Sequence, residues 1–236
     1  MAFLVPNVVV FAIVPVKRLG VSKRRLSKFL SPHERKLLTI AMLEDVLKAL
    51  KSSIVHKTVV VSSDPDVRMI ADSFGVSFFS PSRYGLNPAI QEATAWCMQN
   101  LADSVLVVPA DIPLLSSVDV NKIVELGNCN GSTVVLSPSH NGGTNALFQK
   151  PPNLLFANFG CKSFARHFKQ ARNKGISIRF HYSNSIALDV DCEEDLLKLF
   201  ESPIANYSKR FLEEAGFASK EPKKHSSLTF KTALEM

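Results

Sequence analysis

The sequence lacks paired cysteines and the glycine loops that commonly bind phosphates. Its four cysteines lie far apart, with no C-x-x-C pair and no histidine cluster beside them. This excludes a zinc ribbon or a disulfide scaffold and favours the reducing environment of the cytoplasm. The ten glycines form neither G-x-x-x-x-G-K-[ST] nor G-x-G-x-x-G. A P-loop or a dinucleotide-binding fold therefore has no support.

A membrane-spanning run is also missing. Residues 1–16 are nearly all apolar, but Pro6 and Pro15 interrupt them, and Lys17 and Arg18 follow them. A signal peptide carries its positive charge before the apolar run, and this run is too short to span a bilayer. We therefore expect a buried strand here and no association with a membrane.

The composition is that of a folded, soluble protein, with 236 residues of which 46% are hydrophobic and 21% charged. Strands alternating with helical stretches predict a three-layer α/β/α fold around a mainly parallel mixed sheet. We expect one domain over residues 1–205 and a polar, basic, mobile tail over 206–236, to which no function is assigned. The expected strands span 8–14, 58–62, 76–79, 104–109, 132–136, 145–149, 178–181 and 186–190. The expected helices span 32–50, a short stretch after 65, 87–101, 117–126, 164–174 and 193–200.

Positive charge is concentrated in one segment. The net charge is +7, and residues 17–36 hold eight basic residues against the single acid Glu34. A local excess of this kind favours an anion site, such as one for a polyphosphate, over a general nucleic-acid surface. A solvated charged face or an RNA-binding patch is the alternative reading.

Acidic residues follow two apolar segments, at the edge where ligands bind to such sheets. Asp111 leaves the strand in VLVVPADIPLL, and Asp189 and Asp191 lie two apart in IALDVDCEEDL. In an extended segment the latter two side chains point to the same side. Carboxylates so placed can hold Mg²⁺ together. The alternative is that Asp191 only caps the helix that begins near Glu193.

Two further segments can cradle an anion. Gly142 and Gly143, in GGTNALF, allow a close backbone approach. The segment FGCKSF leads into a helix whose free N–H groups and hydroxyl can bind an anion. An ordinary turn and a helix cap explain either segment alone. We expect His167, on the same helix, to be a surface or packing residue and not a base.

Together these segments resemble one known family, the guanylyltransferases that activate 2-phospho-L-lactate, or phosphoenolpyruvate in some bacteria, during biosynthesis of the deazaflavin coenzyme F-420. The matching stretches occur in the family's order over about residues 8–200, and they are IVPVKRLGVSKRRLS, ERKLLTIAMLEDVL, GLNPAI, VVPADIPLL, GGTNALF, FGCKSFARH and LDVDCEEDL. The resemblance implies a nucleotidyltransferase with a glycosyltransferase-A-like sheet, and it implies a homodimer.

The resemblance also implies roles for individual residues. The implied Mg²⁺ ligands are Asp111, Asp189 and Asp191. The implied contacts to the phosphorylated three-carbon acid are Thr144, Gly160 and Ser163. The implied catalytic basic groups of the nucleotide loop are Lys17, Lys23 and Arg25, with Asn87 near the guanine. This chain departs from the family's pattern at Arg24, Ser139 and Lys162, where a serine, an acidic residue and a glycine are common.

The implied reaction transfers GMP from GTP to 2-phospho-L-lactate, giving a lactyl-diphospho-guanosine and pyrophosphate. The acceptor phosphate is already anionic near neutral pH, so positioning and charge cancellation suffice without a strong base. Phosphoenolpyruvate or 3-phosphoglycerate as acceptor stays open. So does a nucleotidyltransferase of the molybdopterin or sugar-phosphate type, although their G-x-G-T/S-x-R loop is missing here. From another class, a non-catalytic RNA-binding module is disfavoured by aspartates at strand ends, and we expect no nucleic-acid partner.

Overall fold

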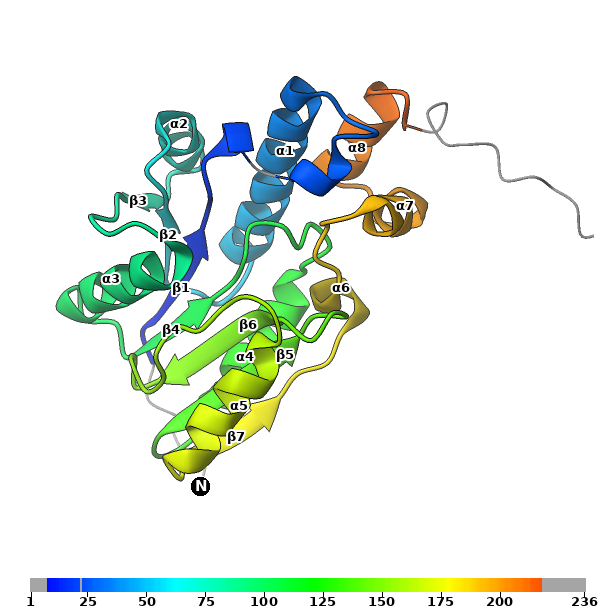
Figure 1. Ribbon diagram of the computed structural model, residues 1–236. Coiled ribbons are helices and arrows are strands. Elements are labelled where there is room, and N and C mark those ends of the chain that lie inside the picture. The colour runs from blue at the N-terminus through cyan, green and yellow to red at the C-terminus, as the bar shows by residue number, and fades with distance from the viewer. Residues whose placement is uncertain (1–7, 22, 218–236) are drawn as a thin grey trace, which may run out of the picture.

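A single seven-stranded sheet forms the centre of the molecule (Figure 1). The computed structural model describes residues 8–21 and 23–217. Its strands are β1 (Val10–Pro15), β2 (Lys57–Val61), β3 (Ser77–Phe79), β4 (Ser104–Val107), β5 (Thr133–Pro138), β6 (Thr144–Lys150) and β7 (Ser177–Phe180). The order is β3-β2-β1-β4-β6-β5-β7, and only β6 runs antiparallel to its neighbours. The expected mainly parallel mixed sheet is confirmed.

Helices cover both faces of the sheet. They are α1 (Pro32–Lys51), α2 (Pro65–Phe74), α3 (Leu86–Gln99), α4 (Ser117–Gly127), α5 (Ser163–Asn173), α6 (Asn184–Ala187), α7 (Glu193–Glu201) and α8 (Tyr207–Glu214). Two short 3₁₀ helices, η1 (Leu19–Val21) and η2 (Arg24–Leu26), lie between β1 and α1. Side chains of α1, α2 and α4 pack on one face, and those of α3 and α5 pack on the other. The result is the predicted three-layer arrangement.

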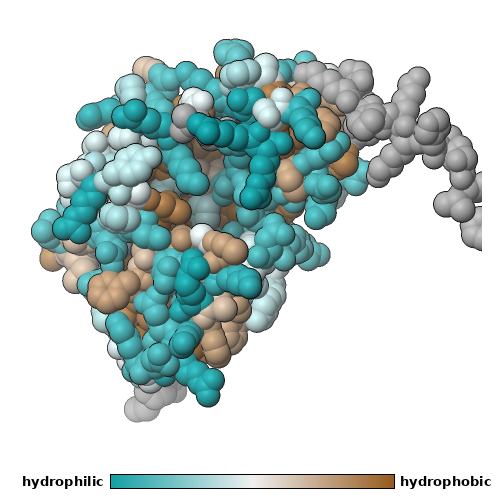
Figure 2. Space-filling view, in the orientation of Figure 1, coloured by the Kyte–Doolittle hydropathy of each residue, from teal (hydrophilic) through white to brown (hydrophobic). Residues whose placement is uncertain are grey.

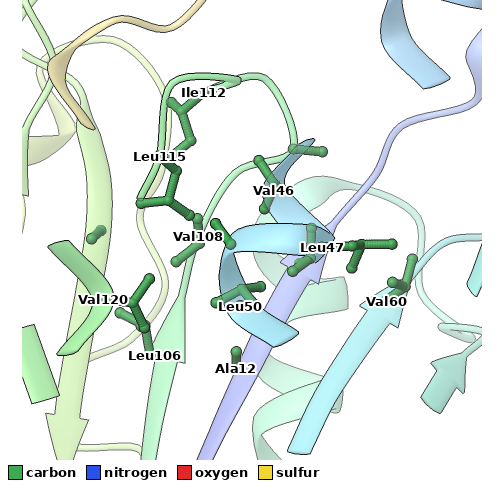
Figure 3. Packing of buried hydrophobic residues seen from close by; sticks show 14 of the residues in the cluster. Ala12, Val46, Leu47, Leu50, Val60, Leu106, Val108, Ile112, Leu115 and Val120 are labelled. Carbon is green, nitrogen blue, oxygen red and sulfur yellow. The ribbon is translucent and has the colours of Figure 1, made fainter. Parts of the chain in front are cut away.

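The core explains why the strands read as continuous apolar runs. Leu47 and Leu50 of α1 lie over Ala12 of β1, Val60 of β2 and Leu106 of β4 (Figure 3). The alternate residues of the same strands face α3 and α5. Strands buried on both faces need apolar side chains at every position. Each fully buried aliphatic side chain contributes about 1.5–3 kcal/mol to folding.

Residues Ser31 to Glu34 define the start of α1. The Ser31 hydroxyl accepts a hydrogen bond from the Glu34 amide at 3.2 Å, and the Glu34 carboxylate accepts one from the Ser31 amide at 2.7 Å. Pro32 occupies the first helical position, where its missing N–H costs nothing. This reciprocal capping box anchors the helix that carries most of one core face.

The expected strand over 186–190 is wrong. Asn184–Ala187 forms the short helix α6, and the residues that follow are extended without joining the sheet. The Val190 amide donates to the Asp111 carbonyl at 2.9 Å, and among the described residues this segment pairs with no strand. Leu188 and Val190 are nevertheless buried while Asp189 and Asp191 are partly exposed. The alternation of buried and exposed residues therefore reflected packing and not a sheet ladder.

The domain boundary expected at residue 205 is too early, because residues 206–217 pack as part of the domain. Helix α8 packs against α1 and α7, with Leu212 and Phe217 buried in a third apolar cluster that also contains Leu188 and Val190. Polar residues on the exposed side of α8 gave this stretch the composition of a tail. The rest of the expected tail, residues 218–236, lies outside the described residues.

The apolar N-terminal run continues into the sheet, since Val10–Pro15 forms β1, while residues 1–7 lie outside the described part of the chain. No helix formed by residues 8–21 or 23–217 is both long enough and apolar enough to cross a membrane.

Asp45 attaches α8 to the domain. Its carboxylate, 5% exposed, accepts hydrogen bonds from the backbone amides of Tyr207 and Ser208 and from the Ser208 hydroxyl. Hydrogen bonds to a buried charged group contribute about 1.5–3 kcal/mol. We expect Asp45→Ala to lower the free energy of unfolding in urea by about 3 kcal/mol because the donors lose their acceptor. Glu213→Ala, an exposed change on α8 itself, is the control and should leave it within about 0.5 kcal/mol. Equal losses in both variants would contradict this anchoring role.

Candidate active site

The segments that carry several of the predicted site residues meet at one edge of the sheet. Because β1, β4 and β5 run in the same direction, the segments that follow them meet at one rim of the sheet. The antiparallel β6 starts at that rim with Thr144. Asp111 lies in the turn after β4, beside the extended residues that carry Asp189 and Asp191. In the orientation of Figure 1, hydrophilic residues cover much of the visible surface, with hydrophobic areas between them (Figure 2).

Lys23 joins two of the predicted carboxylates. Its Nζ lies 2.7 Å from Asp111 Oδ2 and 2.7 Å from Asp191 Oδ1. Its side chain is only 7% exposed, whereas those of Asp111 and Asp191 are 32% and 44% exposed. Lys23 itself has a left-handed backbone, with φ of 55°, immediately before η2. The turn therefore directs a cation from the basic segment to the point where the two carboxylates converge.

Opposing effects set the protonation of this cluster. Burial alone would lower the pKa of Lys23, but the charges of Asp111 and Asp191 outweigh it and hold that pKa above its ordinary value. Burial likewise favours a higher pKa for Asp191, and the charge of Lys23 overcomes it, so the pKa lies below the usual range. Burial and the charge of Asp111 raise the pKa of Asp189. The site thus holds more negative charge than Lys23 balances.

A divalent cation suits this donor set. Among the described residues, no three or more His, Cys, Asp or Glu side chains are gathered at metal-binding distance. Mg²⁺, however, commonly takes one or two carboxylates and completes its shell with water and phosphate oxygens. Two carboxylates that already approach one ammonium group to hydrogen-bonding distance meet that requirement.

Lys17 and Arg25 are exposed at the same edge, close enough for their charges to lower the pKa of Asp191. Their role in a nucleotide loop stays a prediction. The side-chain amide of Asn87, predicted to lie near the guanine, is engaged in hydrogen bonds within the protein. Its amide nitrogen donates to the Phe159 carbonyl at 3.2 Å, and its amide oxygen accepts from the Phe159 amide at 2.7 Å. Asn87 therefore ties the start of α3 to the segment before α5.

The turn between β5 and β6 closes on itself around Ser139. The Ser139 hydroxyl accepts from the Gly143 amide at 2.9 Å, and the Ser139 amide donates to the Gly143 carbonyl. A Cβ at position 143 would lie 2.8 Å from the Ser139 hydroxyl, so only glycine fits here without a shift. Ser139 thus has a structural role in this turn.

Helix α5 begins against this turn. The Phe164 amide donates to the Gly142 carbonyl at 3.3 Å. Ser163, the first residue of α5, is 1% exposed, and its hydroxyl has no hydrogen-bond partner among the described residues. Gly160, with φ of 121°, and Lys162, with φ of 53°, shape the preceding bend. A helix N-terminus with an unsatisfied buried hydroxyl is suited to bind an anion.

Two buried polar residues lie beside the predicted site, Asn145, which the sequence analysis did not single out, and His167, which it did not assign to the site. Asn145 donates to the Ile186 carbonyl at 2.8 Å and to Asp189 Oδ1 at 3.4 Å, so it orients that carboxylate. His167, expected as a surface or packing residue, is fully buried, and its Nδ1 lies 2.9 Å from the Thr144 hydroxyl. The only signal for either was its place inside the segments GGTNALF and FGCKSFARH.

A pocket of about 500 Å³ opens beside the β5–β6 turn. It is lined by residues of that turn and of the segment around α6, including Ser139, His140, Tyr182 and Ser183. None of the predicted site residues lines this pocket. The role of the carboxylates and of the α5 N-terminus as a binding site therefore stays a prediction that this pocket does not test.

Solved structures define the class of the fold. A structure from Desulfovibrio desulfuricans, assigned to the nucleotide-diphospho-sugar transferases, matches with a TM-score of 0.73 at 17% identity, covering 89% of this chain and 97% of the other. A nucleotidyl transferase from Methanothermobacter thermautotrophicus matches with a TM-score of 0.62 at 16% identity, covering 87% and 99%. The fold is that of the nucleotidyltransferases.

Sequence comparison narrows the class to a family. The chain belongs to the family described as "Guanylyl transferase CofC like", whose model matches residues 10–235. A phosphoenolpyruvate guanylyltransferase of Rubrobacter xylanophilus is 37% identical over 202 residues, covering 85% of this chain and 98% of that protein. A 2-phospho-L-lactate guanylyltransferase of Methanothermobacter thermautotrophicus is 35% identical over 210 residues, covering 89% and 92%. The resemblance found from motifs is confirmed.

The buried histidine makes stability depend on pH. Burial, assisted by the charge of Arg166, lowers the pKa of His167 to about 4 from 6.5. The unfolded chain therefore binds a proton before the folded chain does, and stability is fully present above pH 6.5 and declines as pH falls towards 4. We expect this residue to contribute a slope of up to about 1.4 kcal/mol per pH unit in that window.

Urea unfolding at pH 7.5, 6.5, 5.5 and 4.5 measures this slope. His167→Gln should flatten it, and His33→Gln, a change at an exposed histidine, should not. The same slope in wild type and His167→Gln would refute the assignment.

Proposed function

We propose that the protein transfers the guanylyl group of GTP to a phosphorylated three-carbon acid and releases pyrophosphate. The first candidate for the acid is 2-phospho-L-lactate, and phosphoenolpyruvate is the alternative, because relatives with both names match the chain at similar identity. The observation that carries the proposal is the pairing of a charged edge, built on Asp111, Asp191 and Lys23, with a neutral anion cradle at Ser163.

In the proposed reaction, an oxygen of the acid's phosphate attacks the α-phosphorus of GTP. The bond from that phosphorus to the oxygen leading to the β-phosphate breaks, and pyrophosphate leaves with the electron pair. The attacking oxygen already carries negative charge near neutral pH, so no side chain needs to remove a proton. The task of the protein is to align the two substrates and to balance charge on the triphosphate.

Different residues would carry out the different parts of this task. Lys17 and Arg25, which are exposed, would balance the phosphates of GTP, and Lys23 would join them once Mg²⁺ takes its place on Asp111 and Asp191. Asn87 would hold the segment before α5 beside the nucleotide. Asp111 and Asp191 would hold Mg²⁺, and the ion would offset part of the charge of the triphosphate. Asp189, the third predicted ligand, is not gathered with them at metal-binding distance among the described residues. The support on the chain's side is that Asp111 and Asp191 already converge on one cation.

The acid would lie against the neutral cradle. The hydroxyls of Thr144 and Ser163 and the backbone at Gly160 would donate to, or closely approach, its anionic oxygens. Thr144 is 3% exposed and Ser163 1% exposed, which keeps these donors away from competing water. Neutral donors at a helix N-terminus favour a carboxylate or phosphate without adding a titrating group.

A homodimer, implied by the resemblance, is also proposed. Strand β7 lies at the edge of the sheet and is paired on one side only, to β5. Phe180, at its end, contacts Phe168 and Tyr182, and the three rings are 37%, 36% and 67% exposed, respectively. An exposed aromatic strip beside a free edge is the surface that a second copy of the chain would cover.

The RNA-binding alternative loses support from the same geometry. Lys23 is directed inward to two carboxylates, and Lys36 is paired with Asp66 at 2.5 Å. Part of the basic segment is therefore neutralised within the protein.

Pyrophosphate release with Mg²⁺ tests the proposal directly. GTP, ATP and CTP are each combined with 2-phospho-L-lactate, phosphoenolpyruvate and 3-phosphoglycerate, and the product is identified by mass. Release with GTP and one of the acids is expected. If no combination turns over, the proposed reaction is wrong even though the fold stands.

Asp111→Asn isolates the role of the charged edge. The change keeps the size of the side chain but removes a negative charge, and we expect turnover to fall by at least about a hundredfold, as for loss of a charge-stabilising element. Asp103→Asn is the matched control, because Asp103 precedes the same strand, β4, at the opposite edge of the sheet. Near-normal turnover of Asp111→Asn with Mg²⁺ would remove Asp111 from the proposed metal ligands.

A further inference from the structure

The imidazole of His167 lies between two groups that determine where its proton is. The ring is fully buried and packs edge-on against Phe159, with centroids 5.0 Å apart. The backbone amide of Asn158 donates to Nε2 at 3.1 Å. On the other side, Nδ1 lies 2.9 Å from the hydroxyl oxygen of Thr144. Both ring nitrogens are therefore engaged.

A backbone amide can only donate, so Nε2 must be the acceptor and carries no proton. The neutral ring then has its single proton on Nδ1, and Nδ1 donates to the Thr144 hydroxyl oxygen. A doubly protonated ring would direct an N–H at the Asn158 amide. The charged group that faces the ring is Arg166, and its guanidinium is held by the carbonyls of Asn158 and Cys161.

This arrangement settles the direction of the Thr144 hydroxyl. Its oxygen accepts from His167, so its own proton points away from the ring. No other hydrogen bond of this hydroxyl is formed within residues 8–21 and 23–217. Gly143, next to Thr144 in the chain, lies near Ser163: a Cβ built on Gly143 would be 3.9 Å from the Ser163 hydroxyl oxygen. The Ser163 hydroxyl has no hydrogen-bond partner among the described residues. Two buried hydroxyls with unused donors thus lie on the same side of the rim.

We propose that His167 is a positioning residue for the acceptor acid, because its Nδ1–H holds the Thr144 hydroxyl as a donor to an anionic oxygen of that acid. The inference rests on the proposed function, which sets the acid against Thr144. Without the ring proton, the hydroxyl could turn and donate to the imidazole, leaving an oxygen lone pair towards a negatively charged ligand. Fixing donors before the ligand arrives removes that unfavourable orientation.

The tautomer is measured first, and without substrate. In the full-length protein labelled with ¹⁵N at histidine, two-bond ¹⁵N–¹H correlation spectra distinguish a proton on Nδ1 from one on Nε2. We expect a neutral, Nδ1-protonated ring for His167, unchanged between pH 6 and 8. A proton on Nε2, or a charged ring in that range, would overturn the inference.

Two substitutions then separate the two ring nitrogens. In His167→Asn the amide group falls near the place of Nδ1 and can still donate to Thr144. In His167→Gln it falls near the place of Nε2 and can still accept from Asn158, but the donor to Thr144 is lost. We expect His167→Gln to raise the KM for the acid about tenfold or more and to leave the KM for GTP within about twofold. His167→Asn should raise the KM for the acid less than about threefold.

Thr144→Val provides the matching deletion on the other partner. If His167 acts through the Thr144 hydroxyl, His167→Gln should add no further rise in the KM for the acid on the Thr144→Val background. Urea unfolding of each variant at pH 7.5 shows that the protein assayed is folded.

The outcomes separate this inference from the proposed function. Wild-type protein that turns over none of the acids would overturn the proposed function and the positioning role with it. An active wild type in which His167→Gln and His167→Asn behave alike, or in which the KM values for acid and GTP rise together, would overturn the positioning role alone.

Discussion

The ion pairs of Lys23 with Asp111 and Asp191 are the interaction on which the candidate site depends. Lys23 lies 88 positions before Asp111 and 168 positions before Asp191, so these ion pairs join three distant segments of the chain. The Lys23 ammonium is buried but its two partners are partly exposed, so removing one partner costs less than the value of about 3–5 kcal/mol for a fully buried ion pair. The pair therefore constrains the basic segment between β1 and α1 to lie over the sheet edge. It also leaves Asp189 as the carboxylate whose charge Lys23 does not balance.

Sheet topology places a group of buried hydroxyls next to this charged site. Because β6 runs antiparallel between β4 and β5, its first residue, Thr144, starts at the rim where β4 and β5 end. The glycine turn before it accepts the Phe164 amide and so brings the N-terminus of α5 to the same edge. One reversed strand thus brings the carboxylates and the hydroxyls together, although they belong to different segments of the chain.

The residues that sequence could predict are those whose position follows from local pattern. Asp111 was found because it follows a buried strand, and α1 because Ser31 and Glu34 form a capping box. The fold class followed from alternating strands and helices. Helix α8 was missed because its burial depends on Asp45, far away in the chain. The partners of Asn145 and His167 were missed for the same reason, since the contacts span 44 and 23 positions and are set by tertiary packing.

The division of the rim into charged and neutral regions has a physical rationale. A triphosphate carries several negative charges, and only cations can offset their mutual repulsion. The acceptor acid must bring a further anionic oxygen close to that triphosphate while keeping it reactive. A cation held tightly on that oxygen would reduce its electron density, whereas neutral hydroxyl and amide donors can orient the molecule through its other oxygens. A buried neutral histidine behind Thr144 preserves that arrangement, because it supplies a donor without adding charge to the side of the rim proposed to hold the attacking group.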